Sequence, residues 1–270
     1  MSPPPQAGPL CTRGSLTAAL RDLGLRPGET VLVHSSLSSL GWVCGGAETV
    51  VRALLDSLGD DGTLVVPAHS GGNSEPADWH NPPVPEAWWP AIRACMPPYD
   101  PRVTPARGVG VIPETVRNWP GALRSAHPQT SFAALGPRAA GIVDGHALDC
   151  QLGERSPLAR LEEAGARILL LGTGFDTCTA FHLAEYRVPA PRVVDNSFAV
   201  MTPGGRRWST VRDVAITSDG FAELGAAFEK EHPVVRGRVG AAQARLFPLA
   251  DAVAHAVTWL REHRPLSVPG

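Results

Sequence analysis

Several features are missing from the sequence, and each absence excludes a class of protein. No apolar run approaches the roughly 20 residues that a membrane-spanning helix requires, and the N-terminal stretch lacks the apolar segment of a secretory signal. The five cysteines are scattered without a CxxC pair, which argues against a disulfide framework or a structural zinc site. The net charge is −2, with no long block of one sign. Neither nucleic acid nor a membrane is therefore an expected partner.

The remaining composition is that of a globular protein. With 270 residues, of which 43% are hydrophobic, the chain is long enough to bury a sizeable core. We expect residues 1–13 to form a disordered or frayed tail and residues 14–265 to form a single domain. Unpaired, scattered cysteines favour the reducing cytoplasm as the location of this protein.

Helix and strand patterns alternate along the chain. We expect a strand after the turn in 27–36, then strands at 63–68, 167–172 and 206–216. Helical periodicity marks 14–25, 47–62, 108–119, 156–166, 219–232 and 248–264, with Ser15 and Ser156 as expected N-caps. This order predicts an α/β fold, namely a layered α/β/α domain with a central mixed sheet.

Residues 69–107 interrupt this pattern. The segment is dense in Pro, Gly and Trp and is too long for an ordinary connection. A disordered linker is one interpretation, but disorder is poor in aromatic residues, and this segment contains Trp79, Trp88 and Trp89. We therefore expect an ordered lid or pocket wall.

The stretch "DTCTAFHLAEYR" (176–187) contains the strongest chemical signal. It follows an apolar strand and a glycine turn, and open α/β sheets bind ligands at such strand ends. At helical spacing Cys178, His182 and Glu185 share one face. Four interpretations remain open at this point: a His base with its carboxylate, a Cys–His nucleophile pair, a metal site that lacks further ligands, or core packing.

Three further loops carry hydroxyl, glycine and histidine residues. Residues 31–46, "VLVHSSLSSLGWVCGG", lead from a strand to a helix, and such a loop is able to cradle phosphates through its N–H groups. Residues 104–114 and 125–136 are similar in composition. By spacing alone each of the three is equally well explained as an ordinary polar loop.

Taken together, these segments resemble the aminoglycoside 3-N-acetyltransferase family, also called the antibiotic N-acetyltransferase family. The similar pieces occur in order and are "HSSLSSLG", "TPARGVGVIPETVRNWPGALRSAHPQTSFAALG", "GERSPLARL", "LLLGTGFDTCTAFHLAE" and "GRVGAAQARLF". The run "HNPPVPEAWW" looks like the Bacillus-type branch. The resemblance implies transfer of acetyl from acetyl-CoA to a small cationic amine, without a metal. It further implies antibiotic resistance as the role, and a homodimer is one assembly to consider.

The resemblance also assigns roles to individual residues. His182 becomes the catalytic histidine, and Asp213 becomes its acidic partner as an alternative to Glu185. The residues expected to contact CoA are Ser35, Ser36, Leu37, Ser38 and Gly41 near the pyrophosphate, Thr104, Gly108, Val109 and Gly110 across the channel, and His127 and Ser131 near the pantetheine. A polycationic substrate calls for carboxylates, and the candidates are Glu75, Asp78, Glu86, Asp100 and Asp213, with Thr179 beside them.

Chemistry then favours one interpretation of the opening stretch. A neutral amine attacks a thioester directly, so it needs a base and an oxyanion site but no enzyme nucleophile. A histidine oriented by Glu185 or Asp213 suits that role. Three alternatives are retained: a related acetyltransferase that acts on another amine, a Cys178-dependent amidase or acyltransferase, and a non-catalytic binder of CoA or cations.

Overall fold

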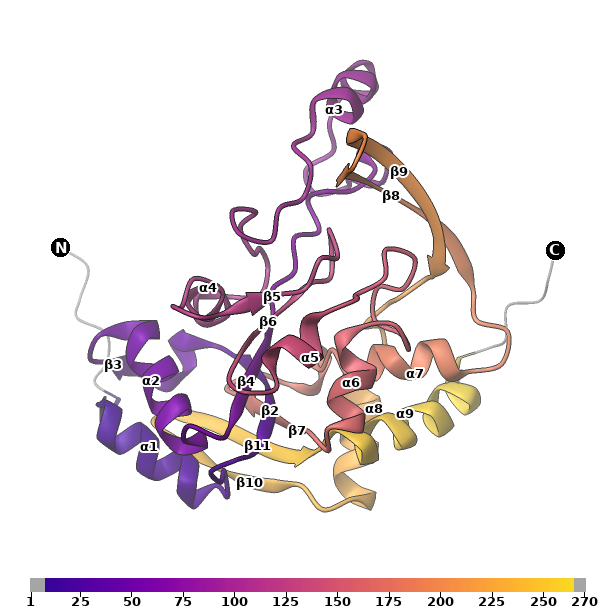
Figure 1. Ribbon diagram of the computed structural model, residues 1–270. Helices are drawn as coiled ribbons and strands as arrows, with labels where there is room; N and C mark the ends of the chain where they lie inside the picture. Colours follow the sequence, from indigo (N-terminus) through magenta and orange to yellow (C-terminus); the bar gives the residue numbers. More distant parts are fainter. Residues whose placement is uncertain (1–7, 265–270) are drawn as a thin grey trace.

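The computed structural model describes residues 8–264 and has a seven-stranded mixed sheet at its centre (Figure 1). The strand order is β10-β11-β7-β2-β4-β6-β5. The strands are β2 (Thr30–Ser35), β4 (Thr63–Pro67), β5 (Leu123–Arg124), β6 (Phe132–Leu135), β7 (Arg167–Leu171), β10 (Val235–Val239) and β11 (Ala242–Pro248). Within this sheet, as far as the structure describes it, only the pairs β2–β4 and β2–β7 are parallel. The predicted α/β class with a mixed sheet is confirmed.

Helices cover both faces of this sheet. One hydrophobic cluster includes residues of α1 (Arg13–Asp22), α2 (Gly46–Leu58) and α4 (Val111–Arg117). A second cluster includes residues of α5 (Ala139–Val143), α6 (Pro157–Glu163), α7 (Phe181–Arg187), α8 (Phe221–Glu231) and α9 (Leu249–His263). The predicted three-layer arrangement follows from these two clusters.

Successive side chains of the inner strands alternate between the two hydrophobic clusters. In β2, Val31 and Val33 belong to the first cluster, whereas Leu32 between them belongs to the second. All three are fully buried, because successive strand residues point to opposite faces and both faces are covered. Each such side chain contributes roughly 1.5–3 kcal/mol relative to exposure. The unbroken apolar runs in the sequence therefore belong to inner strands.

The central strand β2 is also where the connections change direction. From β2 the chain passes through α2 to β4 on one side, while β7, reached through α6, lies on the other. Because β2, β4 and β7 are parallel, their carboxyl ends meet at one edge of the sheet. Such a switch point leaves a crevice between the outgoing chains, where α/β proteins bind ligands.

The segment 69–107 projects away from the sheet together with a long hairpin of β8 (Val193–Thr202) and β9 (Gly205–Val214) (Figure 1). It contains η2 (Pro76–Asp78), η3 (Glu86–Trp88) and α3 (Trp89–Cys95). Asn73 bonds to both backbone groups of Ala199 in β8, each at 2.8 Å. The interpretation of this segment as ordered structure is confirmed.

The N-terminal prediction was wrong in two details. Residues Leu10–Cys11 form β1, which pairs with β3 (Trp42–Val43), and Cys11 is buried. The N-cap of α1 is Thr12, and Ser15 completes a capping box from the third helical position. The expected tail of residues 1–13 is therefore structured from Leu10 onward, because the strand pair and the cap satisfy its backbone. Residues 1–7 lie outside the described part of the chain.

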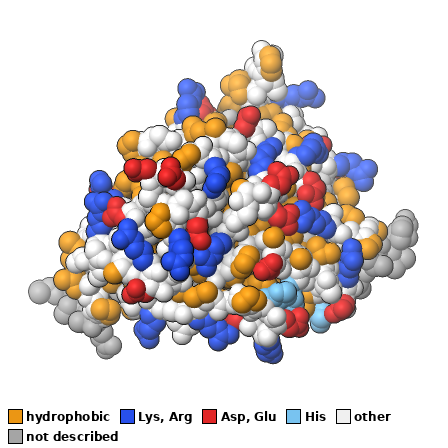
Figure 2. Space-filling model, turned by 60° about the horizontal axis from the view of Figure 1, so that its bottom comes forward, with side chains coloured by type: hydrophobic (Ala, Val, Ile, Leu, Met, Phe, Trp, Pro, Cys, Tyr) orange, Lys and Arg blue, Asp and Glu red, His pale blue; other side chains and the backbone are white. Residues whose placement is uncertain are grey.

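The surface carries charges of both signs. On the face shown in Figure 2, basic and acidic side chains are interspersed with hydrophobic ones, and neither sign forms a broad patch. Within residues 8–264, no helix combines the length and apolar character needed to cross a membrane.

Candidate active site

A cleft of about 910 Å³ lies at the carboxyl ends of the parallel strands. It brings together most residues that the sequence analysis singled out, from segments far apart in the chain. The predicted residues that line it are Ser35, Ser36, Leu37, Ser38, Gly41, Gly108, Val109, Gly110, Thr179 and His182. The cleft is large enough to hold a reactive centre together with part of an extended ligand.

His182 is paired with Glu185 inside α7. The Nδ1 atom lies 2.6 Å from the Oε2 atom of Glu185, one helical turn away. His182 is 14% exposed and Glu185 is 4% exposed. Because the carboxylate accepts the proton on Nδ1, the lone pair of Nε2 is left free, and this side chain lines the cleft. Of the two predicted carboxylates, Glu185 is therefore the one that contacts the histidine.

Glu185 is held on its other oxygen as well. The backbone N–H of Thr217 donates to Oε1 at 3.1 Å, and the guanidinium of Arg264 donates to the same atom. The Phe221 ring packs against the imidazole of His182, with 4.8 Å between the ring centroids. The imidazole is thus fixed by a hydrogen bond on one edge and by an aromatic ring beside it.

Asp213 does not contact His182, so its assignment as the acidic partner was wrong. Its carboxylate accepts from the backbone N–H of Gln151 at 2.7 Å and from the hydroxyl of Tyr186 at 2.9 Å. The residue is buried in β9. It therefore anchors the hairpin to the domain, and these donors already occupy its carboxylate.

Cys178 lies outside the helix that carries His182. It follows the turn η4 (Phe175–Thr177), whereas α7 begins at Phe181, so the expected shared helix face was wrong. The thiol is fully buried in the second hydrophobic cluster. Burial raises the pKa of this thiol to about 12, and a neutral, enclosed thiol is a poor nucleophile. The packing interpretation fits Cys178 best.

The loop after β2 forms one wall of the cleft. Its Ser36 N–H donates to the carbonyl of Leu171 at 3.0 Å, and η1 (Leu37–Leu40) follows directly. The next turn is equally constrained: Gly172 has φ +72°, and a Cβ there would lie 1.7 Å from the Ser39 hydroxyl. Gly172 therefore permits the chains leaving β2 and β7 to approach each other closely.

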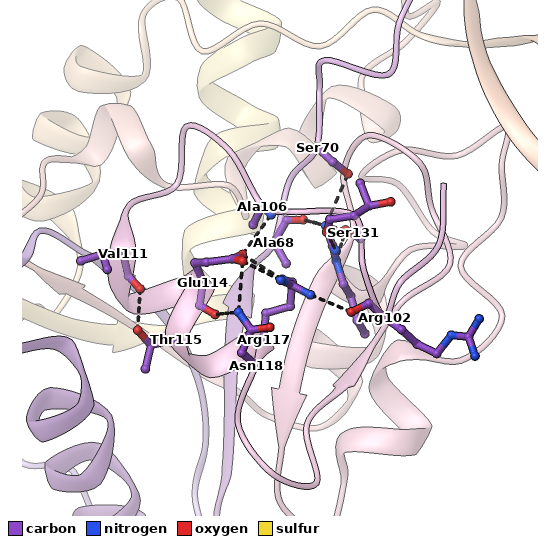
Figure 3. Close-up of polar contacts among 12 residues, drawn as sticks. Ala68, Ser70, Arg102, Ala106, Val111, Glu114, Thr115, Arg117, Asn118 and Ser131 are labelled. Atoms are coloured by element: carbon purple, nitrogen blue, oxygen red, sulfur yellow. Dashed lines mark hydrogen bonds and ion pairs between the residues drawn. The ribbon is translucent and has the colours of Figure 1, made fainter. Parts of the chain in front are cut away.

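The opposite wall, residues 108–111, is held by a partly buried ionic network around Glu114 (Figure 3). Glu114 accepts from the N–H of Ala106 at 3.0 Å, from Arg117 at 2.5 Å and from Asn118 at 3.1 Å. Burial opposes the charge of Glu114, but these donors outweigh it and the pKa of the carboxyl is lowered. The network fixes the chain immediately before the glycines that line the cleft.

Thr104, His127 and Ser131 do not line the cleft, contrary to their expected place in the CoA channel. Thr104 borders a separate cavity of about 830 Å³ that is lined by residues of the 69–107 segment itself. His127 accepts from the Thr130 N–H at 3.1 Å, and Ser131 donates to the carbonyl of Ala68 at 2.7 Å. Both side chains are buried, and both are already hydrogen-bonded to groups of the protein itself.

The carboxylates proposed for a polycationic substrate are not gathered at the cleft either. Glu75 is paired with Arg93 at 2.5 Å and Asp100 with Arg102 at 2.7 Å. Neither these two residues nor Asp78 and Glu86 are among the residues that line it, which include one carboxylate, Asp176. Arginines from the same segment pair with two of the five expected carboxylates, and the fifth, Asp213, does not line the cleft either.

His34 and His69 were not predicted as site residues, yet both line the cleft. In each, Nε2 is buried and has no hydrogen-bond partner among residues 8–264, and the same holds for the hydroxyl of Ser35. Burial lowers the pKa of both imidazoles to about 3, with a smaller contribution from His182. They remain neutral at ordinary pH, and their unsatisfied atoms are available to a ligand. The sequence signal was a "HS" dipeptide at the end of β2 and another shortly after β4.

A cluster of candidate metal ligands lies elsewhere. Glu231, His232 and His255, at the end of α8 and in α9, place one ligand atom each within 4.8 Å of the others. None of the three lines the cleft. Metal chemistry at this cluster would be separate from that of His182.

Comparison with known proteins identifies the group to which the sequence is related. The profile of the aminoglycoside 3-N-acetyltransferase family matches residues 32–261. A prophage-derived aminoglycoside N(3')-acetyltransferase-like protein of Bacillus subtilis, YokD, is 46% identical over 92% of each chain. Aminoglycoside N(3)-acetyltransferase VIII of Streptomyces fradiae is 42% identical over 94% of this chain and 93% of its own.

Solved structures agree with this relationship. The crystal structure of YokD superposes with a TM-score of 0.94 at 44% identity, over 95% of this chain and 96% of that one. A complex of AAC-IIIb with CoASH superposes with a TM-score of 0.84 at 34% identity, over 96% of this chain and all of that one (100%). The architecture and the sequence therefore point to the same relatives.

Proposed function

Because this chain belongs to the aminoglycoside 3-N-acetyltransferase family, we propose that it transfers acetyl from acetyl-CoA to the 3-amino group of a 2-deoxystreptamine aminoglycoside, with His182 as general base. One observation carries the mechanism: His182 lines the cleft, its Nδ1 is bonded to Glu185 behind it, and no described residue bonds to its Nε2. Acetylation of such a drug would give antibiotic resistance.

His182 and Glu185 divide the proton chemistry between them. The neutral amine attacks the thioester carbonyl. Nε2 of His182 takes the proton that the amine nitrogen loses as the C–N bond forms. Glu185 stabilises the imidazolium that forms, without itself becoming protonated. Collapse of the tetrahedral intermediate breaks the C–S bond, and the proton passes to the departing CoA thiolate. Such general-base help is typically worth about 10²–10⁴-fold.

The two walls of the cleft fit a CoA-sized co-substrate. The Ser35–Gly41 loop offers hydroxyls and backbone N–H groups to a pyrophosphate, and the glycines at 108 and 110 permit close approach of the pantetheine arm. The CoASH complex of AAC-IIIb supports this choice of co-substrate. We propose that the reaction needs no metal, because an amine, a thioester and a base complete it.

The neutral histidines suit the developing oxyanion. His34 and His69 hold buried Nε2 atoms that lack partners in the described chain, beside the cleft that contains His182. A neutral imidazole that carries its proton on Nε2 donates to a carbonyl oxygen, and such a donor is strongest where water is excluded. The acceptor amine would enter beside Thr179 and Asp176.

The test is release of free CoA thiol from acetyl-CoA against a panel of aminoglycosides, including one that lacks the 3-amino group. We expect thiol release with the intact drugs and none with the modified one. Release with both would move the site of attack to another amine. If no drug supports release while CoA still binds, the aminoglycoside proposal fails and another amine is the substrate.

A further inference from the structure

Arg264 links three structural elements behind the catalytic pair. It follows α9 directly, and one arm of its guanidinium donates to Glu185. The other arm donates to the carbonyl oxygens of Thr217 at 2.8 Å and Asp219 at 2.7 Å. The end of α9, the loop before α8 and the buried carboxylate of α7 thus converge on one side chain.

We propose that Arg264 is a positioning residue that orients Glu185 toward His182 and offsets part of its negative charge, so that His182 both accepts a proton and releases it. The inference rests on the proposed role of His182 as the base. It adds to that role a cation, outside the cleft, that tunes the histidine through the carboxylate.

The geometry of the carboxylate supports the orienting role. Oε2 of Glu185 faces His182, whereas Oε1 accepts from Arg264 and from the Thr217 N–H. Rotation of the carboxylate would break bonds on both oxygens at once. With only 4% of the side chain exposed, water has little access to replace a lost donor. Arg264 therefore restricts Glu185 to the rotamer that fixes the imidazole.

The charge argument is independent of the orientation. A buried carboxylate with no other charge nearby stabilises the imidazolium strongly, which would leave the base protonated and unreactive. Arg264 partly cancels that field from the opposite oxygen. The other titratable groups around the imidazole are Asp176 in the cleft wall and the neutral His34 and His69.

Arg264 also packs against the wall of the histidine site. Its Cζ lies 5.5 Å from the centroid of the Phe221 ring, and the same ring lies 4.8 Å from that of His182. The loop that it grips at Thr217 and Asp219 contains Ser218, which lines the cleft. If Arg264 had only a structural role, it would act through this packing alone. The variants must therefore separate the effect of its charge from the effect of its packing.

Three variants make that separation. R264Q removes the charge, R264K keeps the charge but loses the planar fork, and R261A is the matched control. Arg261 lies one helical turn earlier and borders the same small cavity behind Glu185, without a hydrogen bond to that carboxylate among the described residues. For each variant, kcat and kcat/KM for acetyl transfer are measured from pH 5.5 to 9, together with CoA affinity and Tm.

We expect R264Q to lower kcat about 10- to 100-fold, as loss of a charged hydrogen bond does, with CoA affinity unchanged. Its acid limb should move to higher pH, because the full charge of Glu185 then holds a proton on the pair. R264K should lose part of kcat but keep the acid limb of the parent enzyme. R261A should match the parent in both.

Two results would overturn the inference. One is an acid limb in R264Q that coincides with those of R264K and the parent; the other is a kcat that R264Q leaves unchanged. A readout without acceptor separates this from failure of the proposed function: an NMR titration of the His182 ring, assigned by comparison with H182Q. If no aminoglycoside is acetylated but R264Q still raises the midpoint of the His182 titration, the proposed reaction fails and the proposed role of Arg264 stands.

Discussion

Three histidines line the cleft, and their surroundings differ in whether a charged partner is present. His182 has the carboxylate of Glu185 at 2.6 Å on Nδ1. In the described part of the chain His34 and His69 have no carboxylate partner, and burial lowers the pKa of each to about 3. One site is therefore built to stabilise an imidazolium, and the other two keep the imidazole neutral.

The difference shows that residue type and cleft position do not assign a catalytic role. A base must stabilise its own protonated form, which requires a partner such as Glu185. A donor to an oxyanion must keep its proton, which burial without a carboxylate achieves. Under the proposed mechanism the same type of side chain serves opposite purposes within one cleft, and substitutions test this contrast.

Replacing His182 should have the largest effect. H182A removes the only one of the three histidines with a carboxylate partner among the described residues, and we expect kcat to fall by about 10²–10⁴-fold. CoA affinity should stay within a few-fold, because the Ser35–Gly41 loop is intact. Steady-state thiol release and calorimetric CoA binding measure the two quantities. Turnover equal to that of the parent would remove His182 from the mechanism.

Glu185 should come next. E185Q keeps the shape of the side chain but removes the charge that stabilises the imidazolium, and we expect kcat to fall about 10- to 100-fold, as loss of a charged hydrogen bond does. The acid limb of kcat/KM should move to lower pH, since the imidazole then releases its proton more easily. The pH profile from 5 to 9 checks both effects, with D213N as the control: its acid limb should not move, because Asp213 bonds elsewhere.

The neutral histidines should affect stability more than proton transfer. The pKa of His69 is about 3 in the folded protein and about 6.5 when unfolded, so below pH 6.5 the unfolded state binds more protons. The contribution of His69 to the free energy of unfolding is therefore complete above pH 6.5. It decreases by up to about 1.4 kcal/mol per pH unit as the pH falls from 6.5 toward 3.

The variant H69N tests this. Its free energy of unfolding should fall less steeply with decreasing pH than that of the parent, as measured by urea unfolding between pH 7 and 5. The acid limb of its activity should not move. Equal slopes in the two proteins would show that His69 titrates normally in the folded state.

Cys178 should have the smallest effect. Its thiol is fully buried, and burial raises its pKa to about 12, so we expect C178A to keep kcat within about threefold. The cost should be stability, because removing a buried small side chain leaves a gap of about one atom. Complete loss of turnover in a folded C178A would instead favour a covalent route.

Much of the fold was predictable from local patterns. Buried strands such as β2 and β7 are apolar on both faces, and capped amphipathic helices such as α6 begin where Ser156 and Pro157 indicate. The pairing of β1 with β3 and the strand β6 were missed. Both depend on contacts between distant segments, and a two-residue strand has no periodicity to detect.

The site was only partly predictable for a related reason. Spacing within one helix identified His182 with Glu185, because three residues along a helix fix a contact. Asp213 was misplaced because strand position does not reveal which distant donors a carboxylate will meet. His34 and His69 were missed because their burial depends on the packing of the whole sheet edge.

The bond between Asn73 and Ala199 has a consequence for biosynthesis. The two residues are 126 positions apart, so the ribosome releases the 69–107 segment long before the β8–β9 hairpin that clasps it exists. Strands β7 and β11 of the central sheet also emerge after that segment. The nascent chain therefore carries this segment without its partner hairpin until most of the protein has been synthesised, and the segment docks late in folding.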